Sequence, residues 1–416
     1  KDIQININDM DINVLKEMTV IMKDVTDYRS DISYQPLENI IMITFTAILA
    51  NCDEWEQIRE FGVIHRDWFA KFLNLEFEIP SVSTFRKTMA IVDPEELECI
   101  CVNYIIKKVE ELEKLLIVKS VEEKAEKDII SYDGKVCRGS KRDNTVNGQV
   151  KPLNAMSAFN VTKDICLATK FIEEKTNEIP TGPELIKLLD LTNTISTFDA
   201  LNTQEKTIRA IVDKKGDYVA ALKGNQQSFY QDVVDYFEDQ ELYNAAYSKC
   251  HYEETEKAHN QLEKRTYIMT EDIGWLNTKK WANIKSIGIC KKECTNINDN
   301  TVTIEIRYYI SSLNINEIRE FSRAIRDEWG IENNLHWHLD YTFKEDANTT
   351  MIKNSQANLN ILRKLALNIL KLVKPFYNKS LKLIRFKIGQ NFEKEISNIF
   401  SCLYINDLKK IIEQSQ

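Results

Sequence analysis

Glycine and proline are scarce in this chain, which has eleven glycines and seven prolines among 416 residues. Collagen-like and low-complexity chains need far more of both, so the composition excludes fibrous and disordered classes. Long apolar runs are also missing, because the longest, near residues 39–50, falls short of the roughly 20 residues that a membrane-spanning helix needs. The first residues lack the basic start and the cleavage site of a signal peptide, so we expect an intracellular protein.

Cysteines at metal-binding spacing are few. The nine cysteines are scattered and odd in number, which does not make a disulfide framework, and we predict reduced thiols. Cys99 and Cys101 stand close together, as do Cys290 and Cys294. Neither pair has a second Cys or His pair at a zinc-finger distance, so the sequence disfavours structural zinc.

An excess of positive charge is missing too, since the formal net charge is −9. Nucleic-acid binding needs only a local basic surface, however, and two segments could supply one. The stretch from Arg363 to Lys387 carries eight basic residues and no acid, which fits either such a surface or a solvated helix face. A second cluster, Lys135, Arg138, Lys141 and Arg142, directly follows Asp133.

Hydrophobic periodicity predicts an α/β protein in four parts. A helical N-terminal domain covers residues 1–127, and the first part of a core covers 128–223. In that core, strands are expected at 129–132, 154–160, 165–173, 193–198 and 218–222, with helices at 181–189 and 203–214. Three strands, helix, strand, helix, strand is the order of a ribonuclease-H-like mixed sheet. Residues 224–312 are predicted to form a β-rich insertion and the return to the core, and 313–416 a core helix and C-terminal helices.

Three carboxylates occupy positions that suit metal chemistry. Asp133 and Asp199 follow the first and fourth predicted strands, and Glu332 lies in an amphipathic helical stretch. Two metal ions can activate a nucleophile and stabilise the leaving oxygen of a phosphodiester, and Mg²⁺ favours carboxylate ligands. We predict that Asp133 bridges two ions, that Asp199 holds one of them and that Glu332 holds the other.

The helix around Glu332 carries further side chains. His336 and Asp340 follow Glu332 at i+4 and i+8, so a helix that continues past Gly330 places all three on one side. His336 could then order a metal-bound water, orient Glu332 or contact a phosphate. A zinc site at Glu332 and His336 lacks a third nearby soft ligand. The indoles of Trp329 and Trp337 are expected to pack in the core rather than stack on bases.

With these residues the chain resembles the H-repeat-associated insertion-sequence transposases, a family of DDE enzymes with a ribonuclease-H-like core. The resemblance covers nearly the whole chain, and the order of its motifs makes it specific. The motifs are Trp55-Glu-Gln-Ile-Arg-Glu-Phe-Gly, Ile79-Pro-Ser, Asp133-Gly-Lys, Asp199-Ala-Leu, Leu222-Lys-Gly-Asn-Gln, Tyr308-Tyr-Ile-Ser-Ser-Leu, Trp329-Gly-Ile-Glu-Asn and Phe343-Lys-Glu-Asp.

The resemblance implies metal-dependent cleavage of DNA at insertion-sequence ends and strand transfer into a target. It implies Mg²⁺ or Mn²⁺ as cofactor, in two ions, and double-stranded DNA of the ends and the target as partner. It further implies a homodimer on DNA and a location in the bacterial cytoplasm with the nucleoid. The expected DNA-binding residues are Lys135, Arg138, Lys223, Asn225, Gln226, His259, Arg265, Arg326, His336 and Lys344, although a loop-forming role fits Lys223, Asn225 and Gln226 equally well.

The chain departs from the family pattern at three positions. Asn202 stands where the family has His, and Asn260 and Gln261 follow His259 where it has Gly and Arg. Loss of that guanidinium would weaken the positioning of DNA phosphates. The sequence therefore leaves open an active transposase, an adopted or decayed transposase that binds DNA without catalysis, and a nuclease without strand transfer. A glycosidase that uses Asp133 and Glu332 is a remote alternative, and it would need no metal.

Overall fold

The computed structural model describes residues 12–30, 34–117, 126–138, 142–144, 148–150, 152–172, 178–258, 261–348, 350 and 352–403. The chain forms two compact units. The first, here called the helical unit, comprises Lys1–Glu123, Val136–Asn154 and Leu335–Gln416. The second, the sheet unit, comprises Lys124–Lys135 and Ala155–Asn334. Within the described ranges, no helix combines the length and the hydropathy that crossing a membrane requires.

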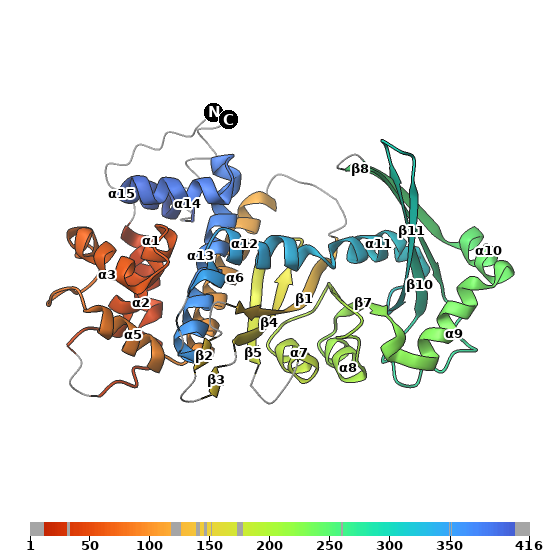
Figure 1. Ribbon diagram of the computed structural model, residues 1–416, viewed down its shortest axis with the longest axis horizontal. Coiled ribbons are helices and arrows are strands. Elements are labelled where there is room, and N and C mark those ends of the chain that lie inside the picture. Colours follow the sequence, from red (N-terminus) through yellow and green to blue (C-terminus); the bar gives the residue numbers. More distant parts are fainter. Residues whose placement is uncertain are drawn as a thin grey trace. The chain divides into compact units, whose positions relative to one another are not determined.

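The helical unit is built from both ends of the chain (Figure 1). Helix α2 is buried along almost its whole length, which explains the apolar run near residues 39–50. Among the described residues, the two end segments of the chain consist mainly of helices. The N-terminal helices are α1 (Ile12–Met22), α2 (Leu37–Leu49), α3 (Trp55–Ile64), α4 (Arg66–Phe69), α5 (Val82–Ile91) and α6 (Pro94–Ile117); the C-terminal ones are α12 (Trp337–Tyr341), α13 (Lys353–Tyr377), α14 (Leu381–Gln390) and α15 (Phe392–Ser401). A small hairpin of β2 (Arg142–Asn144) and β3 (Gly148–Val150) also belongs to this unit.

The basic stretch on α13 and α14 is neither a continuous basic surface nor a solvated face. Arg363, Lys364, Lys371 and Arg385 are buried, while Lys374 and Lys382 are exposed. The Arg385 side chain is 1% exposed and donates to the carbonyls of Ile48 and Thr342 and to Asp53 Oδ1. Four of the eight basic side chains are therefore buried inside the unit, and Arg385 among them ties α14 to residues of other segments.

The sheet unit contains a mixed sheet of nine strands in the order β5-β4-β1-β6-β7-β11-β10-β9-β8. Strand β6 pairs in parallel with both β1 and β7, whereas β11 joins β7 in antiparallel orientation. The predicted order of three strands, helix, strand, helix, strand is present. These elements are β1 (Asp128–Cys137), β4 (Leu153–Asn160), β5 (Ile165–Ile172), α7 (Glu178–Lys187), β6 (Thr194–Phe198), α8 (Glu205–Asp213) and β7 (Asp217–Leu222).

The segment after β7 is more regular than its sequence suggested. Within the predicted β-rich insertion lie strands β9 (Gln261–Thr270), β10 (Ser286–Asn296) and β11 (Val302–Ser311). The segment also contains strand β8 (His251–Ala258) and two helices that the prediction did not specify, α9 (Gln227–Glu238) and α10 (Gln240–Lys249). Strand β8 is an edge strand with few apolar residues, as is common at sheet edges, so it shows no alternating hydrophobic pattern.

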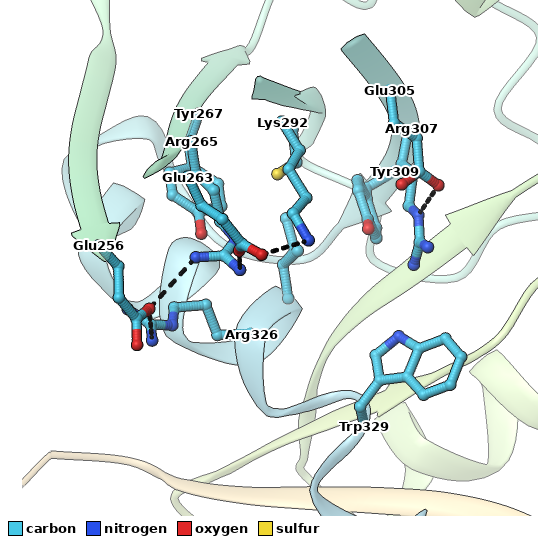
Figure 2. Close-up of a pocket in the computed structure, with 12 residues that line it drawn as sticks. Glu256, Glu263, Arg265, Tyr267, Lys292, Glu305, Arg307, Tyr309, Arg326 and Trp329 are labelled. Atoms are coloured by element: carbon cyan, nitrogen blue, oxygen red, sulfur yellow. Dashed lines mark hydrogen bonds and ion pairs between the residues drawn. The ribbon is translucent and has the colours of Figure 1, made fainter. Parts of the chain in front are cut away.

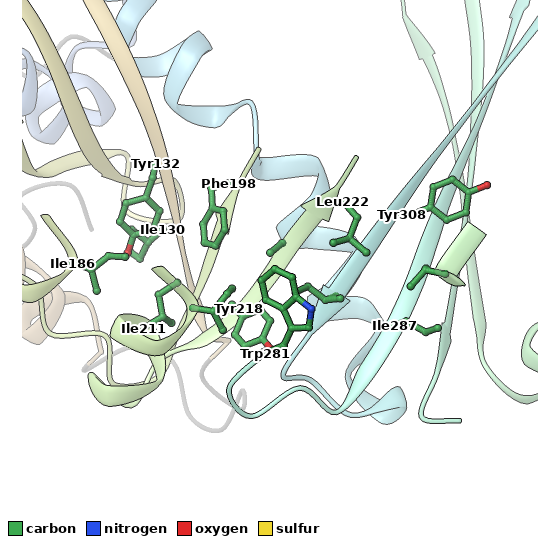
Figure 3. Packing of buried hydrophobic residues seen from close by; sticks show 14 of the residues in the cluster. Ile130, Tyr132, Ile186, Phe198, Ile211, Tyr218, Leu222, Trp281, Ile287 and Tyr308 are labelled. Atoms are coloured by element: carbon green, nitrogen blue, oxygen red, sulfur yellow. The ribbon is translucent and has the colours of Figure 1, made fainter. Parts of the chain in front are cut away.

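Each face of the sheet has its own core. One face packs against α7, α8, α9 and α10, and Figure 3 shows part of this cluster, including Tyr132, Phe198 and Tyr218. The other face packs against α11 (Ile318–Asp327), whose Phe321, Ala324 and Ile325 enter the second cluster. Because side chains alternate along a strand, Ile130 and Tyr132 lie on the first face and Ile129 on the second. The side chain of Asp133 is therefore on the face that α11 covers.

The first strand does not end where the sequence analysis placed its end. Strand β1 runs on to Cys137, so Asp133 lies inside it rather than after it. The pairing of β1 with β6, however, stops at Ser131. Asp133 therefore lies just past the part of β1 that pairs with β6, in a strand whose other neighbour is β4.

Candidate functional site

The three predicted carboxylates, Asp133, Asp199 and Glu332, line one cavity of about 470 Å³ in the sheet unit. We call this cavity the carboxylate pocket. Carboxylate oxygens of Asp133 and Glu332 lie within 4.8 Å of one another. The other charged side chains of its lining are Lys223, Glu305, Arg307 and Glu328.

A hydrogen bond links the strand of Asp133 to the segment of Glu332. The Ser131 hydroxyl, on the same face of β1 as Asp133, donates to the carbonyl of Glu328 at 2.7 Å. The Asp133 carboxylate also accepts from the backbone N–H of Gly134 at 2.9 Å. The bond from Ser131 holds the turn after α11 against β1, which brings Glu332 to Asp133.

Asp199 is held by Asn202, one of the three residues that depart from the family pattern. The backbone N–H and the side-chain Nδ2 of Asn202 both donate to Asp199 Oδ1, each at 3.1 Å. Asn202 is 1% exposed, so these bonds are sheltered from water. Thr203 donates to the carbonyls of Asp199 and Ala221, which ties the loop after β6 to the end of β7. Asn202 therefore orients one oxygen of Asp199 and leaves the other available to the pocket.

The loop after β7 supports the same segment. Asn225 donates to the carbonyl of Ala200 at 2.7 Å, and Gln226 donates to Ala200 and to Thr203. These contacts fit the loop-forming alternative, while the side chain of Lys223 lines the carboxylate pocket. Contact of Lys223, Asn225 or Gln226 with DNA stays a prediction.

Glu328 is a fourth carboxylate in the pocket that the sequence analysis missed. Its pKa is raised to about 7, chiefly by burial; the negative charges of Asp199 and Asp133 add to the rise, and Arg307 and Lys223 oppose it. Its Oε2 atom is buried and has no hydrogen-bond partner among the described residues. Glu328 precedes Glu332 by four residues, and residues four apart lie on the same face of a helix, so this spacing could have pointed to Glu328.

A single π-helical turn, Glu332–His336, replaces the regular helix expected around Glu332. The predicted i+4 and i+8 stacking of His336 and Asp340 on Glu332 assumed an α-helix, whereas this turn is π-helical, and the stacking itself stays a prediction. Gly330 precedes this turn and packs against Val161, where a Cβ atom would lie 2.6 Å from Cγ1. Close approach, rather than helix breaking, explains this glycine. Single π turns are frequent at functional sites.

Both tryptophans of this region are exposed, contrary to the prediction that they pack in the core. The side chain of Trp329 is 55% exposed on the rim of the carboxylate pocket, and that of Trp337 is 48% exposed. The guanidinium of Arg307 lies over the Trp329 ring, 6.0 Å from its centre. The turn between α11 and the π helix points the Trp329 side chain outward.

The remaining predicted DNA-binding residues come from several parts of the chain. Arg265 and Arg326 line a second cavity of the sheet unit. Lys135 follows Asp133 on β1. Arg138, His336 and Lys344 belong to the helical unit, where Lys344 pairs with Asp53 at 3.4 Å, and His259 lies outside the described residues.

The donor set of the carboxylate pocket fits a hard divalent cation. Asp133, Asp199 and Glu332 offer only carboxylate oxygens, which Mg²⁺ and Mn²⁺ prefer. Asp133 and Glu332 already stand close together, and Asp199 keeps one oxygen free of Asn202. Three acids with room for water in the remaining positions are enough for such an ion.

Two family models match the chain. The model described as "Transposase DDE domain" matches residues 124–369, and that described as "DDE_Tnp_1-associated" matches residues 20–105. The first of these spans all three carboxylates.

Relatives in bacteria have similar sequences over most of their length. A putative transposase, YncI, from Escherichia coli O157:H7 is 30% identical over 343 residues, which are 80% of this chain and 82% of that protein. The H repeat-associated putative transposase YhhI from Escherichia coli K12 is 28% identical over 361 residues, 86% of this chain and 90% of that protein. Among solved structures, a synaptic complex of piggyBac transposase with hairpin DNA has 12% identity and a TM-score of 0.39, over 95% of this chain and 79% of that chain.

Proposed function

Since the chain belongs to the family of transposases with a DDE domain, we propose that it cuts DNA at insertion-sequence ends and joins the freed 3′ end to a target. The observation that carries the proposal is the convergence of Asp133, Asp199 and Glu332 on one pocket. Their two strands and one helical turn lie far apart in sequence, so local structure alone does not explain their meeting.

The proposal includes a divalent cation site at these carboxylates. Asp133 and Glu332 would share one ion, and Asp199 would complete the site for a second, with Mg²⁺ or Mn²⁺ supplying activation of the attacking oxygen and stabilisation of the leaving oxygen. The protein itself would fix the positions of the three carboxylates. Asn202 orients Asp199, and Ser131 holds the Glu332 segment against β1.

The remaining charged groups of the pocket suit a phosphodiester. Lys223 and Arg307 bring positive charge to a cavity whose other charged lining residues are acids, and Arg307 can donate two hydrogen bonds to a phosphate. Glu328, whose pKa is raised to about 7, is partly protonated at neutral pH. That protonation lowers the negative charge that an approaching phosphate meets.

A ribonuclease-H-like core is part of the same proposal. Its support is the strand order β5-β4-β1-β6-β7 and the parallel pairing of β6 with β1 and β7. The proposal has four further parts: the predicted basic residues contact DNA, the chain is divided into the four predicted domains, it assembles as a homodimer on DNA, and it associates with the nucleoid.

The test is a cleavage and joining assay on a labelled duplex that carries the flanking ends of the encoding locus. We expect nicked and joined products with Mg²⁺ or Mn²⁺, and none after Glu332→Gln. Glu305→Gln, which changes the same charge on the same pocket, is the matched control and should keep both products.

Each failure of this assay has a distinct meaning. Salt-sensitive binding without products would replace the proposal by a binding protein derived from a transposase. Nicked but never joined DNA would make the chain a nuclease. Full activity in Glu332→Gln would remove Glu332 from the metal site.

A further inference from the structure

A second cavity of the sheet unit, of about 480 Å³, opens over strands β9, β10 and β11 and beside α11. We call it the arginine groove. Its lining holds four basic side chains, three acidic ones and the exposed Trp329, and it shares Glu305, Arg307 and Trp329 with the carboxylate pocket. The basic residues are Arg265, Lys292, Arg307 and Arg326, and the acidic ones are Glu256, Glu263 and Glu305.

The guanidiniums in this groove are already engaged by carboxylates (Figure 2). Glu256 Oε2 lies 3.4 Å from Arg265 Nη1 and 2.9 Å from Arg326 Nη2, so one carboxylate oxygen bridges both arginines. Arg326 also pairs with Glu254 at 3.1 Å, and Arg265 with Glu263. Among the described residues, Glu256 is the one carboxylate that pairs with both.

We propose that the arginine groove is a binding site for DNA backbone phosphates and that Glu256 is a latch that holds its two arginines until DNA displaces it. The inference rests on the proposed function, since it takes DNA as the ligand. The groove adjoins the carboxylate pocket through three shared residues, so a strand held at the carboxylates can extend into it. Arginine forks match phosphate oxygens, and Trp329 adds an apolar surface at the junction.

The strength of the pairs suits a latch rather than a permanent support. Glu256 and Arg326 are 48% and 40% exposed, and ion pairs at such exposure are weak. Each phosphate that an arginine neutralises releases condensed counterions from DNA, which favours exchange of the carboxylate for the phosphate at low salt. The latch therefore lowers DNA affinity without preventing binding.

The opposite face of β8 offers a matched control. Glu253, three residues before Glu256, pairs with Lys264 at 3.1 Å and accepts from Thr266 at 3.1 Å. It is absent from the lining of the groove. Glu253→Gln and Glu256→Gln thus change the net charge of the same strand equally, but only the second frees Arg265 and Arg326 from a shared partner.

The test measures DNA affinity of the full chain by fluorescence anisotropy against salt, in EDTA so that no cleavage occurs. We expect Glu256→Gln to bind roughly two- to fivefold more tightly than Glu253→Gln, the range that a weak exposed pair allows. Its salt slope should be steeper by up to about 0.9 for each phosphate gained. The gain should vanish when Arg265→Gln and Arg326→Gln are added, because the latch then has nothing to hold.

The outcomes separate the two claims. Equal affinities of Glu256→Gln and Glu253→Gln, or a gain that survives loss of both arginines, would overturn the latch and leave the proposed function standing. Absence of salt-sensitive DNA binding in every variant would overturn the groove and the DNA-binding part of the proposed function together. Melting curves of each variant and of the parent test whether the substitutions leave folding unchanged.

Discussion

Asn202 stands where the resemblance predicts a histidine, and its side chain has a structural role at the carboxylate pocket. The family pattern has His at this position, and its loss looked like damage to the site. In the structure, Asn202 is buried and gives two hydrogen bonds to one oxygen of Asp199. The residue thus positions a carboxylate, which weakens the case for a decayed enzyme.

Removal of the Asn202 amide should therefore reduce activity more than stability. We expect Asn202→Ala to slow metal-dependent cleavage about tenfold and to cost about 1 kcal/mol of folding free energy, the usual contribution of one hydrogen bond. Gln204→Ala, two residues on, removes a bond to the Leu201 carbonyl instead and should leave cleavage unchanged. Rapid cleavage by Asn202→Ala would show that Asp199 needs no such support.

Glu328 gives a pH signature of its own. Its pKa is raised from 4.5 to about 7 in the folded chain, so folding favours the protonated form. The stability that this proton contributes is fully present below pH 4.5 and is lost as the pH rises through about 7. Glu328→Gln, which is neutral at all pH values, should be more stable than the parent at pH 8 by on the order of 2 kcal/mol.

Thermal melts at pH 4.5 and pH 8 measure this difference. The advantage of Glu328→Gln should disappear at the lower pH, where the parent carboxyl is protonated as well. Glu305→Gln is the control, because it removes one carboxylate from the same pocket at a side chain that is 54% exposed beside Arg307. An equal gain at both pH values would mean that packing, not charge, favours glutamine.

Some residues of the carboxylate pocket could be predicted from the sequence, and others could not. Asp133, Asp199 and Glu332 were predicted because each stands at the end of a hydrophobic pattern or within one. Glu328 was missed because its role depends on burial and on the neighbouring Asp133 of β1 and Asp199 after β6, which no local pattern records. Trp329 was misassigned because a turn, not a helix, carries it.

Among the elements, the π turn after α11 is the one whose geometry the carboxylate pocket depends on most. Gly330 allows that turn to approach Val161, and a Cβ atom there would lie 2.6 Å and 2.7 Å from the two methyl carbons of Val161. We expect Gly330→Ala to cost about 1–3 kcal/mol through overpacking, partly offset by the helix propensity of alanine. Cleavage should fall as Glu332 moves with the turn.

The matched control for this change is Gly274→Ala, because nothing lies within 4 Å of a Cβ atom at Gly274. Shortening the opposing side chain should restore the contact, so the double variant Gly330→Ala with Val161→Ala should recover part of the lost stability and cleavage. No recovery would mean that Gly330 serves a purpose other than close approach.

Helix α14 depends on a buried cation. Arg385 donates to two carbonyls and to the Asp53 carboxylate at 2.8 Å, and its removal would leave these acceptors short of a partner. We expect Arg385→Met to lower the free energy of unfolding by about 3–5 kcal/mol, as for other broken buried pairs. Urea unfolding followed by circular dichroism measures it. Lys382→Met, on the exposed side of the same helix, should change stability by less than about 1 kcal/mol.

Most elements could be predicted from hydrophobic period, since the strands β4, β5, β6 and β7 and the helices between them follow it closely. The exceptions have physical causes. Strand β1 continues beyond the part that pairs with β6, and β8 is a charged edge strand. In the basic stretch from Arg363 to Lys387, the sequence did not show which side chains are buried, because charge alone does not reveal which of them have partners.

At the scale of the whole molecule, the chain combines a helical unit drawn from both ends with a sheet unit drawn from the middle. The carboxylate pocket and the arginine groove are both complete within the sheet unit. The sequence could not predict this division, because each unit combines segments that are separated along the chain by segments of the other unit. A boundary placed at a single position in the sequence cannot describe such units.

The central claim, that Asp133, Asp199 and Glu332 form one divalent cation site, can be tested without any knowledge of the DNA sequence. The measurement is a calorimetric titration of Mn²⁺ into the parent and into Asp133→Asn, Asp199→Asn, Glu332→Gln and Glu305→Gln. We predict that each of the first three weakens or abolishes binding and that Glu305→Gln matches the parent. Unchanged Mn²⁺ binding in any of the three, or an equal loss in Glu305→Gln, would contradict the site.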